Sequence, residues 1–207
     1  MQDAPMHQDN ASTRGRAPQL KWLIILAVLC TTGCTGSLYK VKPASELPPL
    51  PATASKVDVG SLTLRAVPLV NDEEGQALFE ANVQLAGLLP VRIEIVHNGG
   101  DPIELKKLRF ELRDSAGTSW KLLTAKQAIG RILKANDVYA YNPKSRQTFE
   151  KEFGSYGLDA KSPLSHGERR RTGFLFFQSP KKEPVASPHG LILNVAGLAQ
   201  PVNLSLN

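Results

Sequence analysis

The sequence predicts a mainly-β protein, an antiparallel β-sandwich with a helical excursion between two strands. From residue 57 onward, apolar residues alternate with polar ones over short runs, which is the pattern of half-buried strands. Turn residues separate these runs at intervals of about eight to twelve positions, as they do in sandwiches. Between residue 124 and about residue 157, the apolar residues instead recur at helical spacing.

Length and composition limit the number of domains and the class of protein. The chain has 207 residues, of which 42% are hydrophobic and 21% are charged, and this suits one domain with a tail. The same composition excludes an intrinsically disordered protein and a multi-span membrane protein. The two cysteines, Cys30 and Cys34, are too few for a disulfide scaffold.

Residues 1–33 have the three parts of a secretory signal peptide. A basic segment with Arg14, Arg16 and Lys21 precedes the apolar run Trp22–Cys30, and small residues follow. The apolar run spans about nine to fourteen residues, fewer than the roughly 20 that cross a bilayer as a helix. We therefore expect a cleaved signal peptide rather than a membrane-spanning helix.

The junction Thr31-Thr32-Gly33-Cys34 resembles the lipobox of bacterial lipoproteins. The resemblance implies that Cys34 is lipidated, and that the protein's membrane partner is reached through this lipid anchor. Thr31 departs from the pattern, which usually has leucine there, while the rival Cys30 follows the bulkier Leu29. Lipoproteins kept at the inner membrane commonly have aspartate after the cysteine. Because Thr35 stands there, the resemblance implies the outer membrane, facing the periplasm, in a bacterium with two membranes.

Residues 34–56 are predicted to be the lipidated N-terminus and a proline-rich linker. Pro43, Pro48, Pro49 and Pro51 lie close together, and no helical or alternating pattern runs through them. Such a segment forms a semi-rigid spacer, and at about 3.1 Å per residue it reaches roughly 60–70 Å. We expect no ligand for it.

The β-sandwich domain is predicted over residues 57–207. Residues 57–66 suggest one strand with an irregularity at Gly60, and Asn71–Gly75 suggests a turn. Alternating apolar positions predict the remaining β segments at residues 79–85, 91–96, 103–105, 108–113, 173–177, 191–195 and 202–206.

The helical excursion over residues 124–157 is predicted to contain two helices. Thr124 is a candidate N-cap for the first, and Asn136-Asp137 a candidate stop. Ser145 is a candidate cap for the second, which carries Phe149 and Phe153 one turn apart and ends at Gly154. The segment is too short to bury a core of its own, so we expect it to belong to the sandwich domain.

Several of these strands are similar to those of a known group. The run Gly87–Asn98, the segment Pro102–Leu108 and the turn Asp114–Gly117 resemble uncharacterised bacterial lipoproteins with an immunoglobulin-like β-sandwich domain. A more distant likeness is to the water-stress domain of late-embryogenesis-abundant proteins. The resemblance covers roughly residues 59–195, and it implies a fold and a location but no catalytic residue.

The residues that usually carry chemistry do not form a recognised motif. His97, His166 and His189 lie far apart, each at a predicted turn where we expect it to be solvated, so no metal or other cofactor is expected. The serine in Gly154-Ser155-Tyr156-Gly157 lacks the spacing of a nucleophile elbow. We therefore expect a protein that is not an enzyme.

Basic residues cluster at Lys106-Lys107, Arg169–Arg171 and Lys181-Lys182. An exported chain seldom meets nucleic acid, so we expect no nucleic-acid partner and interpret these clusters as solvated faces. Contact with anionic lipid head groups or an acidic cell-wall polymer is the alternative.

Three functional hypotheses follow. We favour a lipid-anchored envelope protein that acts as a non-catalytic interaction or structural module for another envelope protein or a cell-wall polymer. The alternatives are an envelope assembly factor or chaperone with an apolar groove, and an envelope hydrolase. Aromatic residues concentrate in binding surfaces, so we expect Tyr139, Tyr141 and Tyr156 to be partly exposed and to border the binding surface.

Overall fold

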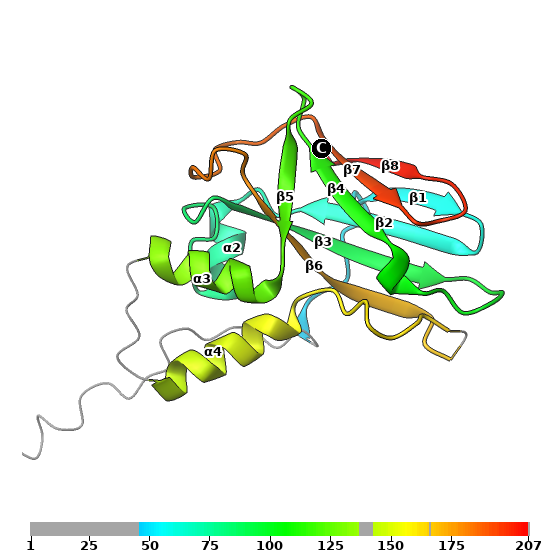
Figure 1. Ribbon diagram of the computed structural model, residues 1–207, viewed down its shortest axis with the longest axis horizontal. Helices are drawn as coiled ribbons and strands as arrows, with labels where there is room; N and C mark the ends of the chain where they lie inside the picture. The colour runs from blue at the N-terminus through cyan, green and yellow to red at the C-terminus, as the bar shows by residue number, and fades with distance from the viewer. Residues whose placement is uncertain (1–45, 137–142, 166, 207) are drawn as a thin grey trace, which may run out of the picture. The chain divides into compact units, whose positions relative to one another are not determined.

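The computed structural model describes residues 46–136, 143–165 and 167–206 (Figure 1). The predicted signal peptide, Cys34, Tyr139, Tyr141 and His166 lie outside the described residues.

In the described part of the chain, eight antiparallel strands form one sheet, which confirms the mainly-β prediction. The sheet has the order β1-β2-β3-β6-β5-β4-β7-β8. Its two outermost strands, β1 and β8, lie against each other, and Ser55 Oγ donates a hydrogen bond to the carbonyl oxygen of Ser205. The sheet therefore curls into a sandwich-like shape. The strands are β1 (Ser55–Val59), β2 (Leu62–Pro68), β3 (Leu88–His97), β4 (Arg109–Arg113), β5 (Ser119–Leu123), β6 (Arg170–Gln178), β7 (Leu191–Ala196) and β8 (Val202–Leu206).

The interior of the sandwich is filled by alternate residues of these strands. In β3, Val91, Ile93 and Ile95 face inward and are fully buried, as the alternation predicts. They pack with inward-facing residues of the opposite strands, among them Leu193 and Leu204. Burial of these aliphatic side chains is the main stabilising contribution to this part of the fold.

A helical layer covers the outer face of β3 and β6. It contains α2 (Asp72–Phe79), α3 (Ala125–Ala135) and α4 (Pro143–Ser155); a short 3₁₀ helix, η2 (Leu105–Lys107), precedes β4. Between the helices and the sheet lies an aromatic cluster whose neighbouring ring centroids are 4.9 to 6.2 Å apart. The cluster consists of Phe79, Phe149, Phe153, Tyr156, Phe174 and Phe176.

The helical excursion is confirmed, and its first helix begins where predicted. Thr124 Oγ1 accepts a hydrogen bond from the backbone N–H of Gln127 at 3.3 Å, while Gln127 Oε1 accepts one from the backbone N–H of Thr124 at 2.9 Å. This capping box satisfies two N–H groups that the helix leaves free. The second helix starts at Pro143 rather than Ser145 and ends at Ser155 rather than Gly154.

Several local predictions in the first half of the domain are wrong. Residues 103–105 form an isolated bridge at Ile103 and the start of η2 rather than a strand. Residues 57–66 are not one strand but the β1–β2 hairpin, which Gly60 permits by adopting a φ of +56°. The predicted turn at Asn71–Gly75 is the start of α2, because Asn71 Oδ1 accepts a hydrogen bond from the backbone N–H of Glu73 at 2.8 Å.

The predicted strand over residues 79–85 is also wrong. Phe79 ends α2, and Glu80 takes a left-handed conformation with a φ of 47° that turns the chain. Ala81 and Val83 are buried from the following turns rather than from a strand. The alternation of apolar residues in this segment therefore results from burial in turns and not from extended backbone.

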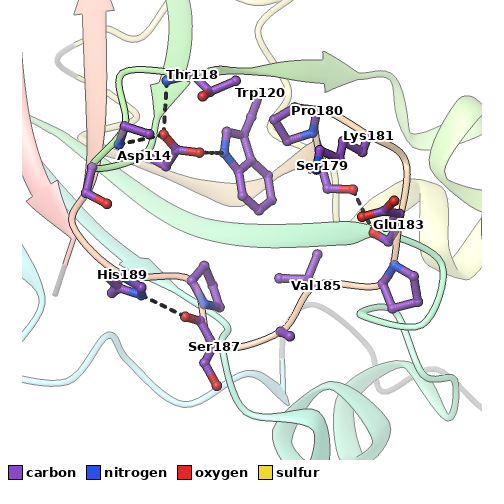
Figure 2. Close-up of a pocket in the computed structure, with 15 residues that line it drawn as sticks. Asp114, Thr118, Trp120, Ser179, Pro180, Lys181, Glu183, Val185, Ser187 and His189 are labelled. Atoms are coloured by element: carbon purple, nitrogen blue, oxygen red, sulfur yellow. Dashed lines mark hydrogen bonds between the residues drawn. The ribbon is translucent and has the colours of Figure 1, made fainter.

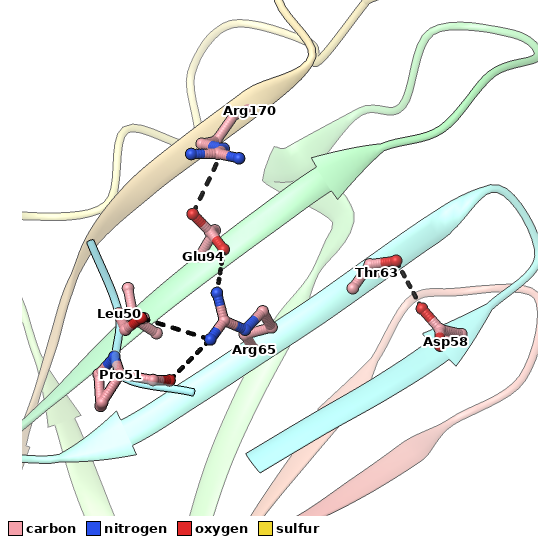
Figure 3. Close-up of polar contacts among 7 residues, drawn as sticks. All are labelled: Leu50, Pro51, Asp58, Thr63, Arg65, Glu94 and Arg170. Carbon is pink, nitrogen blue, oxygen red and sulfur yellow. Dashed lines mark hydrogen bonds and ion pairs between the residues drawn. The ribbon is translucent and has the colours of Figure 1, made fainter. Parts of the chain in front are cut away.

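The end of the predicted linker packs against the sheet (Figure 3). Leu50 is buried, and Arg65 Nη2 donates hydrogen bonds to the carbonyl oxygens of Leu50 and Pro51 at 3.4 and 2.7 Å. Arg65 also pairs with the buried Glu94 at 3.1 Å, and Glu94 lies 3.3 Å from Arg170. Leu47 also packs against the buried cluster of the helical layer, so a free spacer can extend no further than the residues before Leu47.

Candidate functional site

A groove opens where β4 and β5 separate. The two strands pair only beside their shared turn, at Leu112 with Trp120 and Arg113 with Ser119. Beyond Trp120, β5 pairs with β6 instead, so β4 and β5 diverge (Figure 1). The opening, which we call the β4/β5 groove, has a volume of about 1020 Å³. It is bounded by these strands, the start of α3, the end of α4 and residues 157–161.

The floor and walls of the β4/β5 groove are mostly apolar. Phe110 of β4 and Leu158 of the loop after α4 are half-buried, and Leu122 of β5 is 39% exposed. The buried Leu123 and Phe176 also line the groove. A concave apolar surface of this kind is typical of binding sites, because large exposed apolar areas are uncommon elsewhere on a protein surface.

The edge of the groove is basic. Its charged residues are Lys106, Lys126, Lys161 and Asp159. Lys106 Nζ pairs with Glu104 at 2.9 Å, and Asp159 Oδ2 lies 3.6 Å from the guanidinium of Arg171. Within the part of the chain that the structure describes, Lys126 and Lys161 have no carboxylate partner. Among the described residues, the groove therefore combines a mostly apolar lining with two lysines, Lys126 and Lys161, that form no ion pair.

A smaller pocket of about 400 Å³ lies between the β4–β5 turn and the loop 179–189 (Figure 2). Asp114 Oδ1 accepts hydrogen bonds from the backbone N–H groups of Ala116 and Thr118, both at 3.0 Å. Asp114 Oδ2 accepts one from Trp120 Nε1 at 3.4 Å. Burial opposes ionisation of this carboxyl, but its hydrogen bonds to Thr118, Trp120 and Ala116 outweigh burial and lower the pKa of Asp114.

The other polar groups of this pocket also hold loops in place. Ser179 Oγ donates a hydrogen bond to the carbonyl oxygen of Glu183 at 2.7 Å, and His189 Nδ1 donates to that of Ser187 at 3.0 Å (Figure 2). Asp114, Ser179 and His189 all form hydrogen bonds to neighbouring backbone groups and so hold the loops of this pocket in place. We therefore take the β4/β5 groove as the candidate site.

Tyr156 is buried, so the prediction that its side chain is partly exposed is wrong. Its side chain is 1% exposed and lies between the rings of Phe79 and Phe174, at 5.4 and 5.6 Å. Tyr156 lies where the chain returns from α4 to β6, and its ring packs in the buried cluster of the helical layer. The neighbours of Tyr156 in sequence, Ser155 and Gly157, do line the groove.

Burial gives Tyr156 a measurable pH dependence. Desolvation, assisted by the nearby carboxylate of Glu46, raises the pKa of Tyr156 from 10.0 to about 12. In the unfolded chain the phenol ionises near pH 10, so the stability that this group contributes is complete below pH 10 and is lost as the pH rises toward 12. Two pH units correspond to about 2–3 kcal/mol.

Denaturant unfolding at about pH 9 and about pH 12 tests this prediction. We expect the wild-type protein to lose about 2 kcal/mol more than Tyr156→Phe over this range, because phenylalanine cannot ionise. Parallel losses in the two proteins would contradict it.

The exposure of the described histidines and of Arg171 differs in part from the prediction. His97 was expected to be solvated but is fully buried at the end of β3, where Nε2 donates a hydrogen bond to the carbonyl oxygen of Asp101 at 3.1 Å. His189 is exposed, as predicted. Arg171 was interpreted as part of a solvated run, but it is buried and pairs with Glu168 at 2.7 Å. Within the described residues, no three His, Cys, Asp or Glu side chains form a group that could hold a metal ion.

No strand was predicted at β5, and the groove beside this strand was therefore missed. The segment Ser119–Leu123 contains Leu122 next to Leu123, so both faces of the strand are apolar there and the alternation breaks. That adjacent pair was the available signal, since it indicates a strand with no fully solvated face.

The structure thus defines a mainly-β domain with a helical layer on one face and an apolar, basic-edged groove beside that layer. None of the described helices combines the length and the apolar character that crossing a bilayer requires. Comparison of the chain with protein-family models, with curated proteins and with solved structures gave no match.

Proposed function

We propose that this protein is a lipid-anchored component of a bacterial cell envelope, and that its β domain is a non-catalytic binding module. The anchor rests on the resemblance of the Cys34 junction to a lipobox. The module rests on one observation above all, the β4/β5 groove with its mostly apolar lining. In a bacterium with two membranes, the proposed location is the outer membrane, facing the periplasm.

The same groove favours a second candidate function, that of an envelope assembly factor. Such a protein holds an apolar segment of another molecule until it is delivered. The exposure of Leu122 and the half-buried Phe110 and Leu158 provide the contact surface that this role requires. Both functions use the groove, and they differ in whether the bound molecule is later released.

Replacing Cys34 by serine tests the anchor. We expect the Cys34→Ser variant to lose acyl labelling and to move from the membrane fraction to the soluble fraction, because the thiol is the acceptor of the lipid. Cys30→Ser is the matched control and is expected to behave as wild type. A Cys34→Ser variant that still partitions with membrane and still labels would exclude the anchor.

A photo-crosslinking amino acid at position 122 tests the binding module in intact cells. Position 192 is the matched control, since Ile192 is 44% exposed on β7 and Leu122 is 39% exposed on β5, and Ile192 does not line the groove. We expect an adduct at position 122 that is absent at position 192. Equal adducts at both positions, or none at either, would refute the groove as a binding site.

A further inference from the structure

We propose that the β4/β5 groove binds a single-chain amphiphile with an acidic head group, such as a fatty acid. Its acyl chain lies along the apolar floor, and its head group lies at Lys126 and Lys161. This inference rests on the proposed function, because it assigns a ligand class to the same groove.

The shape and lining of the groove fit an acyl chain. The volume of about 1020 Å³ lies at the upper end of the range of small-molecule sites. Apolar side chains reach it from three directions, with Phe110 on β4, Leu122 on β5 and Leu158 on the loop after α4. Each methylene group placed among them leaves water, which favours binding in proportion to the apolar area covered.

The charges at the edge of the groove select an acidic head group. Asp159, the carboxylate at this edge, is 3.6 Å from Arg171, and its Oδ1 also accepts a hydrogen bond from the backbone N–H of Lys161 at 2.9 Å. Glu104 forms an ion pair with Lys106. Lys126 and Lys161 are both exposed and have no carboxylate partner in the described part of the chain. An anionic head group gains from both ammonium groups, whereas a cationic one is repelled.

Photo-affinity labelling of the full chain in isolated native membranes tests the proposal. The probe is palmitic acid with a diazirine in its chain, and the comparison probe is the alcohol of the same chain. Labelled peptides are mapped by mass spectrometry. We expect the acid to label the peptides that contain Leu122 and Leu158 in preference to the rest of the described domain, and to do so more strongly than the alcohol.

Lysine variants test the head-group contact separately from the fold. In Lys126→Gln/Lys161→Gln, labelling of these peptides by the acid is expected to fall about tenfold, while labelling by the alcohol stays unchanged. The matched control is Lys121→Gln/Lys134→Gln, which removes two exposed lysines that do not line the groove. This control is expected to label as wild type with both probes.

The possible outcomes separate this inference from the proposed function. Equal labelling by acid and alcohol, or labelling by the acid that the lysine variant leaves intact, overturns the acidic amphiphile. Labelling spread over the whole domain also overturns it, because it indicates contact with the bilayer surface. If the acid gives no label while position 122 still captures a protein in cells, the binding module stands and the amphiphile fails. If neither experiment yields an adduct at the groove, both proposals fail.

Discussion

Replacing Phe79 by alanine is expected to lower the free energy of unfolding by about 3–5 kcal/mol. Phe79 is fully buried at the end of α2, and its ring lies 5.2 to 6.2 Å from four other aromatic rings. Those four rings belong to α4, to the turn after α4 and to β6. Removing the Phe79 ring leaves a cavity at the point where the helical layer meets the sheet, and the surrounding rings can fill it only in part.

Denaturant unfolding monitored by circular dichroism measures the effect. Leu85→Ala is the control, since Leu85 lies in the turns after α2 and is 46% exposed. We expect this control to cost less than about 1 kcal/mol. A Phe79→Ala variant that is no less stable than Leu85→Ala would show that the aromatic cluster does not hold the helical layer to the sheet.

Replacing Gly173 by alanine is expected to cost about 1–3 kcal/mol and to disturb the wall of the groove. A Cβ atom at this position would lie 2.5 Å from Leu158 Cα and 2.7 Å from Leu158 N. The backbone of residues 156–158 runs directly beside β6, where the N–H of Phe174 donates to the carbonyl oxygen of Tyr156 at 2.6 Å. The N–H of Leu158 donates to the carbonyl oxygen of Phe174 at 3.2 Å. A methyl group between these segments must push them apart and weaken both hydrogen bonds.

Gly130→Ala is the matched control for Gly173→Ala. Gly130 lies within α3, and a Cβ atom built there meets nothing within 4 Å. Alanine is the better helix former by about 1 kcal/mol, so this variant is expected to be more stable than wild type. Thermal unfolding of the two variants should therefore shift in opposite directions. A Gly173→Ala variant with an unchanged melting temperature would contradict the close approach of residues 157–158 to β6.

The strands that could be predicted from sequence are those with one face buried in the sandwich and the other near water. In β8, Val202, Leu204 and Leu206 are buried and the residues between them are exposed, so the period of two is visible without the structure. The first helix of the excursion was equally visible. Its cap at Thr124 and its buried face, which includes Ile129 and Ile132, both depend on residues close together in the sequence.

The wrong sequence predictions arose where burial on the outer face of the sheet changed the spacing of apolar residues. Leu122 and Leu123 are adjacent because β5 contacts the groove on one side and the helical layer on the other. Phe79, Ala81 and Val83 alternate because the end of α2 and the turns after it, not a strand, bring these residues into the buried cluster of the helical layer. Tyr156 is polar by type, but the aromatic cluster encloses its ring.

Local patterns in the chain were therefore sufficient for the mainly-β class, for most strands of the sandwich and for the two helices of the excursion, because each depends on residues near one another in sequence. The strand order, the helical layer over β3 and β6, and the β4/β5 groove came only from the tertiary structure. Each of these depends on contacts between distant segments, as when residues 157–158 join the edge of β6. The groove exists because β5 pairs with β4 only near their shared turn and with β6 beyond it. This change of pairing partner cannot be predicted from any short stretch of sequence.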